Sequence, residues 1–108
     1  MSSHETFIAR ALAGKVFDPI PEALEAIDAW HEAPTELDIE QWLGMTKAEY
    51  RLFAERPGSI RAILAAKKNN LDVFTSIRDG ETRLAARGAS PQELADLQQW
   101  LKSTGRLP

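Results

Sequence analysis

The sequence predicts an all-α protein, a compact bundle of about six to seven short helices. Apolar residues recur at spacings of three and four along nearly the whole chain, which is typical of amphipathic helices. Isoleucine, valine and threonine never alternate with polar residues over four or more positions, as they would in a strand. Glycines and prolines separate the apolar stretches, and these residues favour helix ends.

The length and composition fit one helical domain over residues 1–108. The chain is 44% hydrophobic and 27% charged, as ordinary globular proteins are. A weak boundary near residues 69–71 allows a subdivision into an acidic helical core, 1–69, and a C-terminal helical hairpin, 70–108.

Four helices are expected in the first half of the chain. They cover residues 3–14, 21–31, 36–43 and 46–55. Ser3 is a candidate N-cap of the first, and Gly14 suits a left-handed end. Two prolines in the connector 16–21 cannot both lie inside one helix, so Pro21 is expected at the first helical position. Gly44 ends the third helix, and Thr46-Lys47-Ala48-Glu49 is a capping box that starts the fourth.

Three more helices are expected in the second half. They cover residues 60–68, 71–87 and 90–104. The spacing of apolar residues stays helical through Gly80, and a break at Asp79-Gly80 is the alternative, because glycine costs about 1 kcal/mol in a helix interior. Ser90-Pro91-Gln92-Glu93 is the clearest helix start in the chain, with an N-cap, a first-turn proline and a capping-box glutamate.

Charge is distributed unevenly along the chain. Residues 1–54 contain four bases and ten acids, a net charge of −6, and residues 55–108 contain nine bases and six acids, a net charge of +3. The segment 18–40 holds eight acids and no base. Opposite charge on two parts of a small domain can steer a charged partner, or the two parts can contact each other across the fold. Alternatively, both charged segments are solvated helix faces.

The sequence offers little of the chemistry that catalysis requires, and we expect no enzyme activity, metal or cofactor. There is no cysteine, and the two histidines, His4 and His31, lie outside any metal-binding spacing. No phosphate-binding glycine loop and no serine-hydrolase motif is found. No apolar run approaches the roughly 18 residues of a membrane helix, and the first residues do not resemble a signal peptide, so we expect a cytoplasmic protein that does not enter membranes.

The stretch Asp38–Phe53 resembles the helix-turn-helix of bacterial DNA-binding proteins. Gly44 matches the turn glycine, and apolar or aromatic residues occupy the positions expected to be buried: Ile39, Leu43, Met45, Tyr50 and Phe53. Two features depart from that motif: Glu40 stands where a small residue is expected, and the acidic segment lies just upstream. If this alternative holds, four basic residues are expected to contact phosphates: Lys47, Arg51, Lys67 and Lys68. Otherwise the stretch is a tight corner of two helices within the core.

A second resemblance covers residues 20–66. Ile27-Asp28-Ala29-Trp30-His31-Glu32, Leu43-Gly44-Met45-Thr46 and Glu49-Tyr50 form a pattern similar to that of small, largely uncharacterised bacterial helical proteins, some of them found beside toxin partners. The resemblance implies an antitoxin-like or accessory regulatory role and assigns no binding residue.

The leading hypothesis is a non-enzymatic regulatory protein that binds a protein partner with a basic surface through an acidic helical face. The expected partner-binding residues are Glu22, Glu25, Asp28, Glu32, Glu36, Asp38 and Trp30. Among the three tryptophans, the exposed ones are the expected anchors, whereas Trp42, Tyr50 and Phe53 are expected in the core. The alternatives are a helix-turn-helix transcriptional regulator and a phage-type inhibitor of a nucleic-acid-handling host complex.

Overall fold

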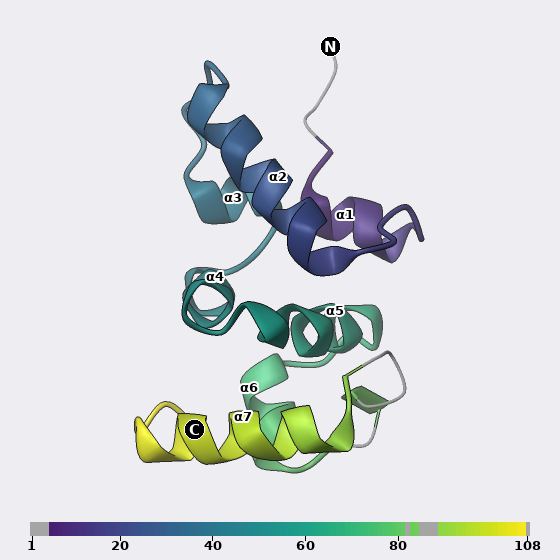
Figure 1. Cartoon of the computed structure of the whole chain (residues 1–108), viewed down its shortest axis with the longest axis vertical. Coiled ribbons are helices and arrows are strands. Elements are labelled where there is room, and N and C mark those ends of the chain that lie inside the picture. Colours follow the sequence, from purple (N-terminus) through teal and green to yellow (C-terminus); the bar gives the residue numbers. More distant parts are fainter. Residues whose placement is uncertain (1–4, 82, 85–88, 108) are drawn as a thin grey trace. The chain divides into compact units, whose positions relative to one another are not determined.

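A computed structural model confirms the all-α class. It describes residues 5–81, 83–84 and 89–107, and no strand occurs among them. In chain order the elements are α1 (Phe7–Leu12), α2 (Pro19–Glu32), α3 (Ile39–Leu43), α4 (Lys47–Glu55), the 3-10 turn η1 (Pro57–Ser59), α5 (Ile60–Lys68), α6 (Val73–Arg78) and α7 (Pro91–Ser103) (Figure 1). None of the helices in these residues combines the length and apolar character needed to cross a membrane.

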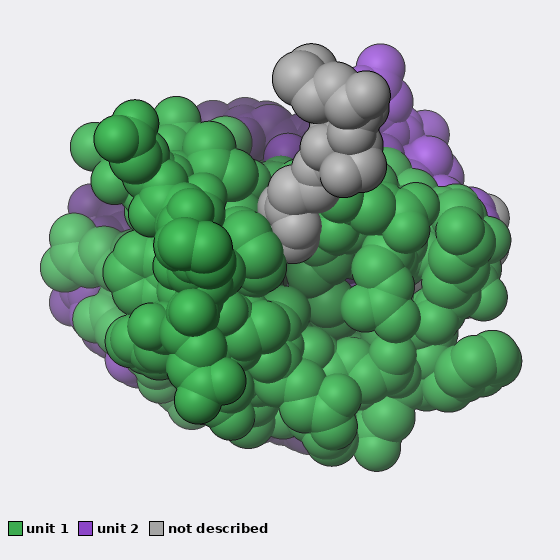
Figure 2. Space-filling view, turned by 90° about the horizontal axis from the view of Figure 1, so that it is seen from above, with its two compact units in different colours: residues 1–57 green, residues 58–108 purple. Residues whose placement is uncertain are grey.

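The chain divides into two compact units, unit 1 (Met1–Pro57) and unit 2 (Gly58–Pro108), coloured separately in Figure 2. The division lies earlier than the 69–71 boundary suggested by the sequence, because α5 packs against α6. Unit 1 carries five bases and eleven acids, a net charge of −6, and unit 2 carries eight bases and five acids, a net charge of +3. The charge asymmetry of the sequence therefore follows the structural division.

Unit 1 is built around α2, which packs against both α1 and α3. Ala23 of α2 is fully buried, as is Leu43 of α3. The half-buried Trp42 ties α3 to α2, since its indole Nε1–H donates to the Ala26 carbonyl at 3.0 Å. Of the aromatic residues expected in the core, Phe53 is buried, whereas Trp42 and Tyr50 are half-buried.

Gly44 allows α1 and the end of α3 to approach closely. Its φ of +87° lies in the left-handed region that favours glycine, and its backbone N–H donates to the Glu40 carbonyl at 2.9 Å. A β-carbon at this position would lie 2.7 Å from Thr6 Oγ1 and 3.2 Å from Ile8 Cβ. The glycine is therefore required both by the turn and by the helix that packs on it.

The capping box predicted at the start of α4 is present. Thr46 Oγ1 accepts the Glu49 backbone N–H at 3.1 Å, and Glu49 Oε1 accepts the Thr46 backbone N–H at 2.8 Å. This reciprocal pair satisfies two of the backbone donors that a helix start leaves open. Glu49 is buried in the box, and its carboxylate is not presented on the exposed side of α4.

In unit 2, α6 packs against α5 on one side and α7 on the other. Ile60, Ile63, Val73 and Leu101 are fully buried. Gln98 of α7 secures the end of α6, because its side-chain amide donates to the carbonyls of Ile77 and Arg78 at 3.0 and 3.1 Å.

Two expected helix boundaries are wrong, for identifiable reasons. The helix expected over 71–87 ends at Arg78, and Gly80 follows with a φ of +67°, which is the break weighed as the alternative; residues 85–87 lie outside the described part. Helix α2 begins at Pro19 and contains both prolines of the connector. The first backbone N–H groups of a helix have no intrahelical acceptor, so prolines there remove no hydrogen bond.

The start of α1 also differs from the expectation. The N-cap is Thr6, whose Oγ1 accepts the Ala9 backbone N–H at 3.0 Å. The expected cap, Ser3, lies outside the described residues.

Candidate functional site

Helix α2 presents an acidic stripe, which we define as Glu25, Asp28 and Glu32. At 3.6 residues per turn the three side chains lie within an arc of about 60°, and all three residues are exposed. In the described part of the chain none of them belongs to an ion pair. The opposite side of α2 carries the buried Ala23 and the half-buried Ile27. The stripe is therefore solvated negative charge on a packed helix.

Glu22 lies one turn before the stripe and has a different role. Its Oε2 accepts the backbone N–H groups of Phe17 and Asp18 at 2.8 and 2.7 Å, and its Oε1 lies 3.9 Å from Arg10 Nη2. The hydrogen bond from the Asp18 N–H, with those from Phe17 and the charge of Arg10, holds the pKa of Glu22 below its usual value. We call this arrangement the Glu22 clamp.

The Glu22 clamp holds the backbone of an exposed aromatic residue. The Phe17 side chain is 92% exposed, although its own N–H and the next one along the chain are both bound. Leu24 precedes Glu25, the first residue of the acidic stripe, and is 48% exposed. Sequence reasoning missed Phe17, and the available signal was its position between Gly14 and the prolines, outside every helical stripe.

The ordinary pKa of a glutamate is 4.5, and we expect the carboxyl group of Glu22 to have a lower pKa than this. Because the pKa of Glu22 is lower in the folded than in the unfolded chain, its ionised carboxylate stabilises the fold at pH values above the ordinary pKa. This stabilisation is lost as the pH falls through the lowered pKa. The amide proton shifts of Phe17 and Asp18, followed by NMR, should therefore move with a midpoint below 4.5. Glu22→Gln should abolish this transition and Glu25→Gln should leave it; a midpoint at or above 4.5 would contradict the clamp.

The other residues expected to bind a partner lie beyond the stripe or are engaged internally. The indole of half-buried Trp30 donates to the Leu37 carbonyl at 2.8 Å, and its ring meets His31 edge-on at 5.0 Å. Trp30 thus fastens α2 to the connector before α3. Glu36 and Asp38 are exposed in that connector, and the Asp38 N–H donates to Gln41 Oε1 at 2.9 Å.

The basic residues of the DNA-binding alternative do not form one helix surface. Lys47 and Arg51 are exposed on α4 of unit 1, where Arg51 pairs with Glu55 at 3.5 Å. Lys67, half-buried, and Lys68, exposed, end α5 of unit 2. The exposed side of α4 therefore combines two cations with a carboxylate, a weak set for contacting phosphates.

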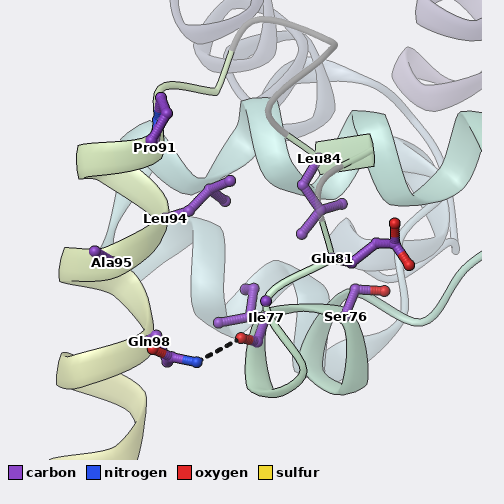
Figure 3. Close-up of a pocket in the computed structure, with 9 residues that line it drawn as sticks. Ser76, Ile77, Glu81, Leu84, Pro91, Leu94, Ala95 and Gln98 are labelled. Atoms are coloured by element: carbon purple, nitrogen blue, oxygen red, sulfur yellow. Dashed lines mark hydrogen bonds between the residues drawn. The ribbon is translucent and has the colours of Figure 1, made fainter.

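Unit 2 contains an apolar cavity of about 300 Å³ between α6, α7 and three residues of the intervening segment, Gly80, Glu81 and Leu84. In Figure 3 the side chains of Ile77, Leu84 and Leu94 point toward one another across it. Its carboxylate, Glu81, accepts hydrogen bonds from the Arg83 side chain and backbone, which lower the pKa of Glu81 to about 2. A carboxylate held ionised in this way is not poised for proton transfer near neutral pH.

A metal centre is not formed by the described residues, in which no group of three or more His, Asp or Glu side chains could hold an ion. His31 is exposed at the end of α2, and His4 lies outside the described part.

These features define a small protein, helical throughout its described elements, with an acidic helix face and an exposed phenylalanine on a hydrogen-bonded backbone. Comparison of the chain with known protein families, with curated proteins and with solved structures finds no match to any of them.

Proposed function

We propose that the chain is a non-enzymatic regulatory protein that binds a protein partner with a basic surface through α2. It acts as an antitoxin does, by occupying its partner's surface. The observation that carries the proposal is the acidic stripe, whose three exposed carboxylates share one side of α2 and form no ion pair with the residues that the structure describes.

Two physical effects would give such a face its function. Negative charge concentrated on one helix accelerates encounter with a positively charged surface and fixes the orientation of approach. Two exposed apolar side chains of unit 1, Phe17 in the connector before α2 and Leu24 on α2, supply the contact area that keeps a partner bound.

The test is a pull-down from a lysate of the source cells, with the unaltered protein and the double variant Glu25→Lys/Asp28→Lys compared as baits. We expect the unaltered protein to retain a basic protein at about 50 mM salt and release it at about 500 mM, since exposed charges are screened over about 4 Å at that ionic strength. The double variant should lose the retained protein, because its stripe repels a basic surface.

The matched control is Glu93→Lys/Asp96→Lys, which makes the same charge change at the same spacing on the exposed side of α7. Retention should survive in this control. Equal loss in both variants, or retention of nucleic acid with no protein, would refute the proposal. The identity of the retained protein separates a toxin from a nucleic-acid-handling host complex.

A further inference from the structure

The most exposed apolar side chain in the described residues is that of Phe17. Four large apolar side chains are exposed there, and all belong to unit 1: Leu12 at 40%, Phe17 at 92%, Leu24 at 48% and Leu37 at 38%. Fully burying a phenylalanine removes roughly 150–250 Å² of surface from water, more than any of the leucines offers. Phe17 is thus the side chain with most to gain from a partner.

The backbone that carries Phe17 is restrained from both sides. Before it, the Lys15 N–H donates to the Arg10 carbonyl at 2.9 Å and ends α1. After it, the Glu22 clamp binds two successive N–H groups, and Pro19 fixes the start of α2. An anchor held in place before binding loses less conformational entropy on association than one in a free loop.

The charges around Phe17 indicate what kind of surface it fits. Asp18 is exposed beside it, and the acidic stripe follows on α2. The two nearby cations are engaged: Lys15 Nζ lies 3.6 Å from Glu5 Oε2, and Arg10 faces Glu22. A complementary surface is therefore apolar where it receives the ring and carries lysine or arginine around it.

We infer that Phe17 is the anchor of the α2 interface and inserts into an apolar pocket of a protein partner whose rim carries Lys or Arg. Glu22 is the residue that positions it. This inference rests on the proposed function and specifies its partner. Insertion into a lipid surface is not expected, because anionic lipids repel the acidic stripe. A second copy of this chain, whose unit 2 is basic, is a separate outcome of the test below.

The first experiment places the photoreactive residue p-benzoylphenylalanine at position 17 of the full chain. Asp28 and Gln99 carry the same residue in control proteins, the first in the stripe and the second exposed on α7. After irradiation in source-cell lysate, position 17 should cross-link to one protein, at a peptide that lies in an apolar pocket near Lys or Arg.

Three other outcomes overturn the inference. Cross-linking from position 28 without position 17 removes Phe17 as the anchor and leaves the proposed function standing. Cross-linking from position 17 to this chain or to lipid replaces the partner. Absence of cross-links from both positions removes the inference and the proposed function together.

The second experiment measures binding rates with the cross-linked protein, purified. Phe17→Ala should raise the dissociation rate about 30-fold and change association little, as loss of a buried anchor does. Glu25→Lys/Asp28→Lys should instead slow association and remove its salt dependence. Leu37→Ala, the matched control on a less exposed apolar residue of unit 1, should leave both rates unchanged.

Glu22→Gln tests the positioning role. It should raise the dissociation rate in the unaltered chain and have no further effect when Phe17 is already alanine, because the clamp acts through that side chain. An undiminished effect of Glu22→Gln in the Phe17→Ala background shows a general structural role instead. An unchanged dissociation rate in Phe17→Ala, with slowed association in the stripe variant, overturns the anchor alone.

Discussion

Replacing Gly44 with alanine should destabilise unit 1 by about 2–5 kcal/mol. Two effects add at this position. The φ of +87° is unfavourable for any residue with a β-carbon, and that carbon would lie 2.7 Å from Thr6 Oγ1 and 2.9 Å from Thr6 Cβ. Relief of the clash must move the N-cap of α1 or the end of α3. Urea unfolding followed by circular dichroism and by tryptophan fluorescence measures the loss.

Gly14→Ala is the matched control for Gly44→Ala. Gly14 also has a left-handed φ, +77°, yet a β-carbon there would meet nothing within 4 Å. Its substitution should cost only about 1 kcal/mol, the conformational part of the effect. Equal losses for the two variants would show that the contact between Gly44 and α1 contributes nothing to stability.

Leu101→Ala should destabilise unit 2 by about 2–5 kcal/mol. The Leu101 side chain is fully buried on α7, so its removal takes apolar surface out of contact and leaves a cavity. The free energy of unfolding from urea titration gives the effect, and a broader transition would report loss of cooperativity between helices.

Leu94→Ala makes the same chemical change two turns earlier on α7. Leu94 is half-buried and lines a cavity that already exists, so the substitution enlarges an opening and creates no new enclosed void. We expect a loss of about 1 kcal/mol, set mainly by the apolar area involved. A loss as large as that of Leu101→Ala would show that the cavity lining is packed as tightly as the core.

The local features of the fold could be predicted from sequence because their causes are local. The box at Thr46 and Glu49, the cap at Ser90 and the left-handed Gly44 each depend on residues within one helical turn. The class of fold followed from the spacing of apolar residues and the absence of strand-like alternation.

The features that depend on side chains meeting across the fold could not be predicted. Glu22 is one of eight acids between residues 18 and 40, and nothing in the sequence distinguishes it from the others. Its hydrogen bonds to the backbone of Phe17 and Asp18 could therefore not be predicted. The same limit applies to Trp30, whose partner is a carbonyl seven residues away. Phe17 was not predicted to be exposed, because the residue type alone does not show whether a phenylalanine lies in the core or on the surface.

The division of charge between the two units bears on the handling of the protein. Its isoelectric point of about 5.4 is an average that describes neither unit, since one is strongly acidic and the other basic. Near that pH the whole molecule has no net charge to keep copies apart, while unlike charges on separate molecules still attract. Solubility should be lowest there and should improve with added salt, which weakens the attraction between the acidic unit of one molecule and the basic unit of another.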